Sequence, residues 1–161
     1  MPSNSSIYVK IVVFTGILVL NFGALAIGSL LMGGSPASNE WYISLDKAPW
    51  TPPGWVFGFA WTFIMICFTF YIYTVFKVKK SLNLTLTLFI LQWFLNILWN
   101  PLFFNLHLPV LALLILLLLL ITLLVLLVYS EFKLQFQLLI LPYVIWLGIA
   151  ISLNFYIIVN N

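Results

Sequence analysis

The chain has 161 residues, of which 65% are hydrophobic and only 6% charged, and its mean hydropathy is +1.22. Soluble domains carry about 25% charged residues, so this composition excludes a soluble protein and an intrinsically disordered one. Six lysines and no arginine give a net charge of +3, which is too sparse for a nucleic-acid surface, and the single Cys67 cannot form an internal disulfide or a zinc site. We therefore expect an all-α integral membrane protein with one domain.

The spans can be counted from the gaps between charged residues. Four stretches lack Asp, Glu, Lys and Arg, and one of them, 81–130, is long enough for two spans of about 20 residues. The Leu-rich run at 113–128 shows no apolar/polar alternation, which favours helices over a membrane barrel. We predict a bundle of five transmembrane helices within a single domain 1–161, at about 7–31, 54–76, 82–103, 109–129 and 135–158.

The first predicted helix begins near Lys10 and is apolar for more than 20 residues. A signal peptide also places a cation before an apolar run, but its apolar region is only about 7–15 residues long, so we expect an uncleaved span. Ala24 and Gly28 form a pair of small residues at a spacing of four, which lets helices approach closely. The partner helix could belong to the same chain or to a second copy.

The loop 32–53 contains most of the segment EWYISLDKAPWTPPG at 40–54. Pro49, Pro52 and Pro53 stiffen it, and the last two suit the first turn of the following helix. A rigid, aromatic loop of this length is typical of a lid over the mouth of the bundle. The alternative is an anchor at the membrane interface, where tryptophans are common.

Three of the predicted helices carry aromatic or amide side chains at spacings of three and four residues, which gather them on one face. Amides within a membrane avoid lipid, so they either hold neighbouring helices together or line a cavity. Such faces could enclose a flat, largely apolar ligand held by a few polar contacts. The residues are Phe57, Trp61 and Phe68 in the second helix, Gln92, Asn96, Trp99 and Phe103 in the third, and Tyr143, Trp146, Ala150 and Asn154 in the fifth.

The distribution of lysines predicts the orientation. Five lysines fall on the side of the N-terminus and only Lys47 falls on the other side. By the positive-inside rule, the N-terminus lies in the cytoplasm if the membrane is a bacterial plasma membrane.

The sequence shows no arrangement of residues typical of hydrolytic, metal-dependent or phosphoryl-transfer enzymes. His107 is the only histidine and lies in a predicted turn, and no pair of carboxylates falls within a span. We expect no metal and no cofactor.

Three ordered segments resemble the tryptophan-rich sensory protein/translocator protein family (TspO/MBR, the peripheral benzodiazepine receptor family). They are WYISLDKAPWTPPGWVFGFAWT (41–62), QWFLNILWNPLFFN (92–105) and LPYVIWLGIAISLN (141–154). The resemblance covers nearly the whole chain, and the five predicted helices match it. There are departures as well. Proline stands at Pro49, one residue later than in the family pattern; the Met-Gly pair that usually follows Trp61 is absent; and no cation follows Tyr156, so the cholesterol motif of animal members is not supported.

The resemblance implies a five-helix bundle, commonly a homodimer, that binds porphyrins such as protoporphyrin IX and also isoquinoline carboxamide and benzodiazepine drugs. It implies a ligand pocket beneath the first loop, with Trp61 and Trp146 matching tryptophans implicated in light-dependent porphyrin degradation. The pocket residues carried over are Tyr42, Pro52, Phe57, Trp61, Asn96, Trp99, Trp146 and Ala150.

Three functions follow as expectations. The first is a membrane sensor or carrier that binds a tetrapyrrole. The second is a light- and oxygen-dependent enzyme that degrades porphyrin with Trp61 and Trp146. The third is a helical scaffold without a ligand, against which the buried amides argue because they are costly to keep in a membrane. The membrane would be a bacterial plasma membrane, or the outer mitochondrial membrane if the source is eukaryotic.

Overall fold

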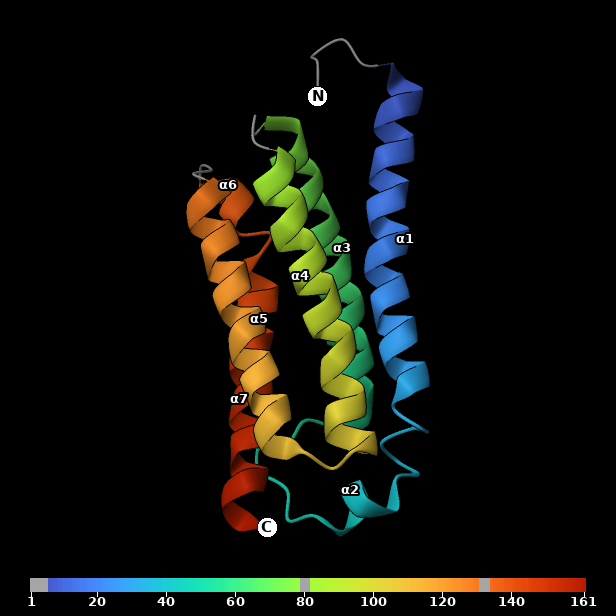
Figure 1. Cartoon of the computed structure of the whole chain (residues 1–161), viewed down its shortest axis with the longest axis vertical. Helices are drawn as coiled ribbons and strands as arrows, with labels where there is room; N and C mark the ends of the chain where they lie inside the picture. The colour runs from blue at the N-terminus through green and yellow to red at the C-terminus, as the bar shows by residue number, and fades with distance from the viewer. Residues whose placement is uncertain (1–5, 79–81, 131–133) are drawn as a thin grey trace.

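Five long helices make up the structure, a computed structural model that describes residues 6–78, 82–130 and 134–161 (Figure 1). Each is long and apolar enough to cross a membrane. The predicted all-α bundle of five transmembrane helices is therefore confirmed. The helices are α1 (Ile7–Leu31), α3 (Gly54–Val78), α4 (Leu82–Asn100), α5 (Pro109–Ser130) and α7 (Leu141–Asn160).

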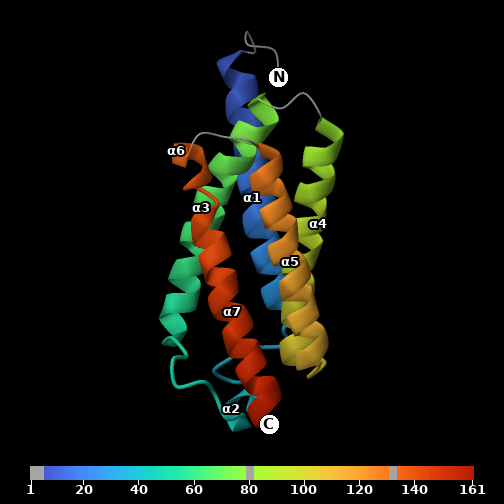
Figure 2. The same ribbon diagram turned by 90° about the vertical axis from the view of Figure 1, so that its left-hand side faces the viewer.

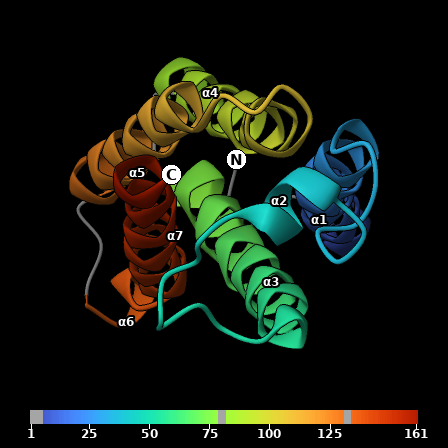
Figure 3. The same cartoon turned by 90° about the horizontal axis from the view of Figure 1, so that it is seen from below.

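The long helices are arranged as a closed ring. Helix α1 packs against α3 and α4, α3 packs against α7, and α5 lies between α4 and α7. Seen along the bundle, the order around the ring is α1, α3, α7, α5, α4 (Figure 3). Neighbours around the ring are therefore not always neighbours in sequence, and the segment between α1 and α3 crosses beneath one end of the bundle (Figure 2).

Three short helical pieces interrupt the pattern expected from the sequence: α2 (Glu40–Ser44) in the first loop, the π-helical turn η1 (Pro101–Asn105) after α4, and α6 (Leu134–Gln137) before α7. The predicted helix at 135–158 is thus divided, and its membrane span begins only at Leu141. The reason is Pro142, which has no backbone N–H to donate and fits the first turn of a helix but not its interior.

The core forms two clusters of buried side chains. The larger cluster surrounds the middle of α3, where Met65, Phe68 and Tyr71 are fully buried. The smaller cluster lies beneath α2 and includes Phe103 and Phe104 of η1. Between them the helices separate around the cavity described below.

Polar contacts hold α1 in the ring. The Asn21 amide donates to the Thr69 hydroxyl of α3 at 2.9 Å, and the Trp93 indole of α4 donates to the Leu20 carbonyl at 2.8 Å. Ala24 and Gly28 are both buried inside the single chain. The structure therefore uses this small-residue pair for packing within one chain.

The ends of the bundle differ in charge. Lys10 lies near the start of α1 and Lys77 near the end of α3, both at the end of the bundle where the chain begins, while Lys47 follows α2 at the opposite end (Figure 1). Lys79, Lys80 and Lys133, which also enter the predicted orientation, lie outside the described residues.

Candidate functional site

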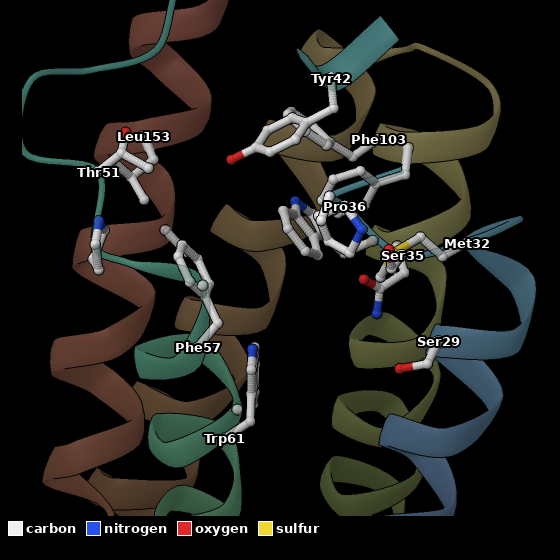
Figure 4. A pocket seen from close by; sticks show the side chains of 18 of the residues that line it. Ser29, Met32, Ser35, Pro36, Tyr42, Thr51, Phe57, Trp61, Phe103 and Leu153 are labelled. Carbon is white, nitrogen blue, oxygen red and sulfur yellow. The ribbon is translucent and has the colours of Figure 1, made fainter. Parts of the chain in front are cut away.

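A cavity of about 830 Å³ lies between the helices at the end covered by the first loop. Its walls come from α1, α3, the α4–η1 junction and α7, and residues between Ser35 and Pro52 line it from the loop (Figure 4). Most of the lining is apolar. The cavity has the size and character of a small-molecule site, which is typically 300–1,000 Å³ with a few polar groups.

Six of the eight residues predicted for the pocket line this cavity. They arrive from separate parts of the chain: Tyr42 and Pro52 from the loop, Phe57 and Trp61 from α3, Trp99 from α4 and Ala150 from α7. Asn96 and Trp146 do not line it. Lining a cavity does not establish that a residue binds a ligand, so the role of all eight in binding stays a prediction.

Asn96 lies behind the cavity wall in a buried polar network. Its amide and that of Gln92 both donate to the hydroxyl of Tyr143, the latter at 3.0 Å. All three side chains are buried, and Tyr143 packs edge-to-face on Trp61, which lines the cavity. Of the two roles left open for these amides, the structure shows them joining helices, α4 to α7.

Trp146 is one layer removed from the cavity. Its ring packs edge-to-face against Phe57, with 5.3 Å between ring centroids, and Phe57 rather than Trp146 faces the space. Trp61 lies directly on the wall and points into it (Figure 4). The two tryptophans proposed for photochemistry are therefore not equivalent in position.

The wall at the α4–η1 junction is aromatic and fixed by hydrogen bonds. Trp99 and Phe103 stack with 5.4 Å between centroids. The Trp99 indole donates to the Asn154 side-chain carbonyl at 3.3 Å, and the Asn154 amide donates to the Pro109 carbonyl at 2.8 Å. Because Asn154 belongs to α7 and Pro109 begins α5, this chain of bonds fixes the Trp99 ring relative to three helices.

The loop carries the charged end of the site. Lys47 is the only Lys, Asp or Glu among the cavity-lining residues that the structure describes, and its ammonium lies 4.9 Å from the centre of the Tyr42 ring. The ammonium also donates to the carbonyls of Ile43 and Leu45. Burial raises the pKa of the Tyr42 hydroxyl above its ordinary value of 10.0, so this group is a neutral donor near pH 7.

Both halves of the loop are fastened to the bundle. In the first half, the Asn39 side chain caps α2 and donates to the Phe104 carbonyl at 2.9 Å, and the Trp41 ring stacks on His107 with 4.4 Å between centroids. In the second half, the Asn161 side chain accepts from the Asp46 backbone N–H and donates to the Asp46 carbonyl. The loop therefore has the contacts of a closed cover.

The α1 wall was missed by the sequence analysis. Phe22, Leu25 and Ser29 line the cavity from α1, and Asn100 lines it from the end of α4. The only sequence signal was the Ala24/Gly28 pair, which marks the face of α1 that approaches another helix. A Cβ atom added to Gly28 would lie 2.6 Å from the Asn100 side-chain nitrogen, so the Asn100 amide packs closely against α1 at this position.

No group of His, Cys, Asp and Glu suited to a metal ion occurs among the residues the structure describes. The site instead offers a space with aromatic walls and one cation at the end covered by the loop. Such a space can bind and orient a flat ligand and bring an indole into contact with it.

Comparison with known proteins agrees with this architecture. The sequence profile of the TspO/MBR family matches residues 14–159. Similar proteins include the tryptophan-rich protein TspO of Archaeoglobus fulgidus, 32% identical over 76% of this chain and 81% of that protein. The tryptophan-rich sensory protein of Cereibacter sphaeroides is 30% identical over 82% and 88%, and the translocator protein of Bos taurus is 30% identical over 72% of each chain. The chain therefore belongs to the TspO/MBR family.

Proposed function

We propose that this protein is a membrane receptor for a tetrapyrrole of the protoporphyrin IX class, which it senses or carries. The observation that carries the proposal is the cavity of about 830 Å³ with aromatic walls on opposite sides. Phe57 and Trp61 stand on α3, and Trp99 and Phe103 stand on α4 and η1. Flat aromatic rings bind well between such walls, because offset and edge-to-face contacts add to the burial of apolar area.

The charge of the site fits one carboxylate better than two. Lys47 offsets one carboxylate of a porphyrin at the loop. The second carboxylate must then stay in water or meet neutral donors such as the Tyr42 hydroxyl. We therefore expect modest affinity.

Tryptophan fluorescence of the detergent-purified protein, titrated with protoporphyrin IX in the dark, tests the proposal. We expect saturable quenching in the wild type and about three- to tenfold weaker binding in a Trp61→Phe/Trp146→Phe double variant, because Trp61 lies on the cavity wall and an aromatic contact contributes about 0.5–1.5 kcal/mol. Trp55→Phe is the matched control, since Trp55 is 73% exposed and does not line the cavity. A Lys47→Ala variant should bind up to about fivefold more weakly, the range for a partly exposed ion pair.

The absence of saturable quenching in the wild type would contradict porphyrin binding and favour another apolar ligand or a ligand-free scaffold. Unchanged binding in Lys47→Ala would contradict only the role of the lysine.

A second candidate is light- and oxygen-dependent oxidation of the bound porphyrin. The position of Trp61 on the cavity wall supports it, because an indole in contact with an excited ligand is a suitable electron donor. Trp146 would act through Phe57 and not by contact. Illumination of the complex in air should then give a new absorbing product that is lost in Trp61→Phe and retained in Trp55→Phe.

The proposal also includes a homodimer in a bacterial plasma membrane, with the N-terminus in the cytoplasm. Its interface lies away from Ala24 and Gly28, because both are buried within one chain. The names of the relatives, sensory protein and translocator protein, support a membrane sensor or carrier.

A further inference from the structure

The cavity wall contains one sulfur atom. Met32 is the only methionine or cysteine among the lining residues that the structure describes. It forms the C-terminal cap of α1, directly before Gly33, where the chain leaves the helix and begins the loop over the cavity. Figure 4 shows its side chain on the side of the cavity opposite Phe57. The Met32 thioether therefore borders the space that a ligand would fill.

Met32 also contributes to the packing that holds the loop in place. Only 9% of the residue is exposed, and it belongs to the buried cluster beneath α2 together with Phe103 and Phe104. Trp41 and Tyr42 of α2 pack against the same cluster. A thioether suits such a position, because it is apolar and makes favourable contacts with aromatic rings. A chemical change that makes this side chain polar would therefore weaken the packing of α2 over the cavity.

Oxidation to methionine sulfoxide is such a change. A porphyrin excited by light passes its energy to dioxygen and is itself left unchanged. One atom of the excited dioxygen then forms a bond to the sulfur and the O–O bond breaks. The second oxygen atom leaves as hydrogen peroxide with the two hydrogens of a water molecule. The sulfur loses two electrons in this reaction, and the dioxygen gains them.

We propose that Met32 is a photo-oxidation site, where dioxygen activated by a light-excited porphyrin in the cavity converts the thioether to a sulfoxide and thereby loosens the loop. The inference rests on the proposed function, because the bound porphyrin is the molecule that absorbs the light. The sulfoxide is polar, and a polar group without a partner is costly in apolar surroundings. The oxidised side chain therefore leaves the cluster beneath α2, and the porphyrin is released faster. The protein would then respond to light and porphyrin together.

Met65 provides a comparison within the same chain. It lies on α3, is fully buried in the larger core cluster and does not line the cavity. An oxidant that forms at a ligand in the cavity should therefore reach Met32 and not Met65.

Peptide mass spectrometry of the detergent-purified protein tests the site. The protein is illuminated in air with increasing amounts of protoporphyrin IX, and the addition of one oxygen atom is measured at Met32 and at Met65. We expect oxidation of Met32 to follow the saturation curve of the dark fluorescence titration, and Met65 to stay unmodified. Oxidation should be absent in the dark and absent without dioxygen.

The effect on the loop is measured after illumination. Fresh protoporphyrin IX is bound in the dark, and its dissociation is followed by the recovery of tryptophan fluorescence. We expect about tenfold faster dissociation from the illuminated wild type, within the range for a polar group placed in apolar surroundings. Met32→Leu has a side chain of similar volume without sulfur, so its dissociation rate should be the same before and after illumination. Met65→Leu is the matched control and should keep the acceleration.

Equal oxidation of Met32 and Met65, or oxidation that keeps rising after binding is saturated, would show that the oxidant forms in solution and would overturn the proposal. Saturable binding without oxidation of Met32 would also overturn it and leave the tetrapyrrole receptor intact. If illumination accelerates dissociation from Met32→Leu as it does from the wild type, the sulfoxide does not control the loop. The absence of saturable quenching in the dark would overturn the proposed function and this inference with it.

Discussion

Tyr143 is a single residue whose contacts connect the cavity to the rest of the bundle. Its hydroxyl accepts from two amides of α4, and its ring packs on Trp61 and Phe68 of α3. Removing the hydroxyl in Tyr143→Phe leaves both amides in the membrane interior without that acceptor. We expect a loss of about 1–2 kcal/mol in the free energy of unfolding, measured by denaturing-detergent titration.

Tyr156→Phe is the control for this prediction. The Tyr156 hydroxyl has no hydrogen-bond partner among the described residues, and its ring packs on the exposed Trp50. Equal stability losses in the two variants would contradict a special role for the Tyr143 network. Tyr143→Phe as stable as the wild type would contradict it too.

Side-chain spacing predicted which residues share a helical face but not which residue on that face is covered by a neighbour. Trp146 and Ala150 are one turn apart on α7, yet the Phe57 ring covers Trp146 while Ala150 is open to the cavity. Asn96 also does not reach the cavity, because its amide is buried and donates to the Tyr143 hydroxyl. Whether a side chain reaches the cavity depends on contacts between helices that are distant in sequence. The spacing of residues along one helix gives no information about those contacts.

At the scale of elements, the loop over the cavity should open mainly where it is fastened to α7. The Asn161 side chain bonds the Asp46 backbone in both directions, at 2.9 and 3.2 Å. Asn161→Ala removes both bonds, which together contribute about 1.5 kcal/mol, so amide exchange at residues 45–51 should accelerate about tenfold. Hydrogen–deuterium exchange with mass spectrometry measures this rate.

The adjacent residue supplies a control, because among the described residues the Asn160 amide bonds only the Tyr156 carbonyl of its own helix. Asn160→Ala should leave exchange in the loop unchanged. If the two variants behave alike, the loop is held by other contacts, such as the Trp50 indole on the Ser152 hydroxyl.

The elements themselves were accessible from the sequence because charge is so costly within a membrane that its absence marks each span. The spacing of charged residues does not predict where individual residues end or distort a helix. Pro142 delays the start of α7, and the turn after Pro101 adopts π-helical geometry. The α1 wall was hidden for a different reason: its lining residues are apolar or small, like those that face lipid, and only the Asn100–Gly28 approach distinguishes them.

At the scale of the whole molecule, the unequal distribution of lysines predicts how the bundle sits in the membrane. The end that carries Lys10 and Lys77 should face the cytoplasm, and the end with the loop and the cavity should face outward. A ligand would then reach the cavity from the outer side or from the bilayer.

Cysteine labelling in intact bacterial cells tests this orientation, starting from a Cys67→Ser background. A cysteine in place of Ser44, which is exposed on α2, should react with a membrane-impermeant maleimide before lysis. A cysteine in place of Val78, which is 60% exposed at the other end, should react only after lysis. The opposite pattern would place the loop in the cytoplasm and overrule the lysine bias. Labelling of both sites before lysis would show that the two orientations coexist. The excess of five lysines over one would then be too small to select a single orientation.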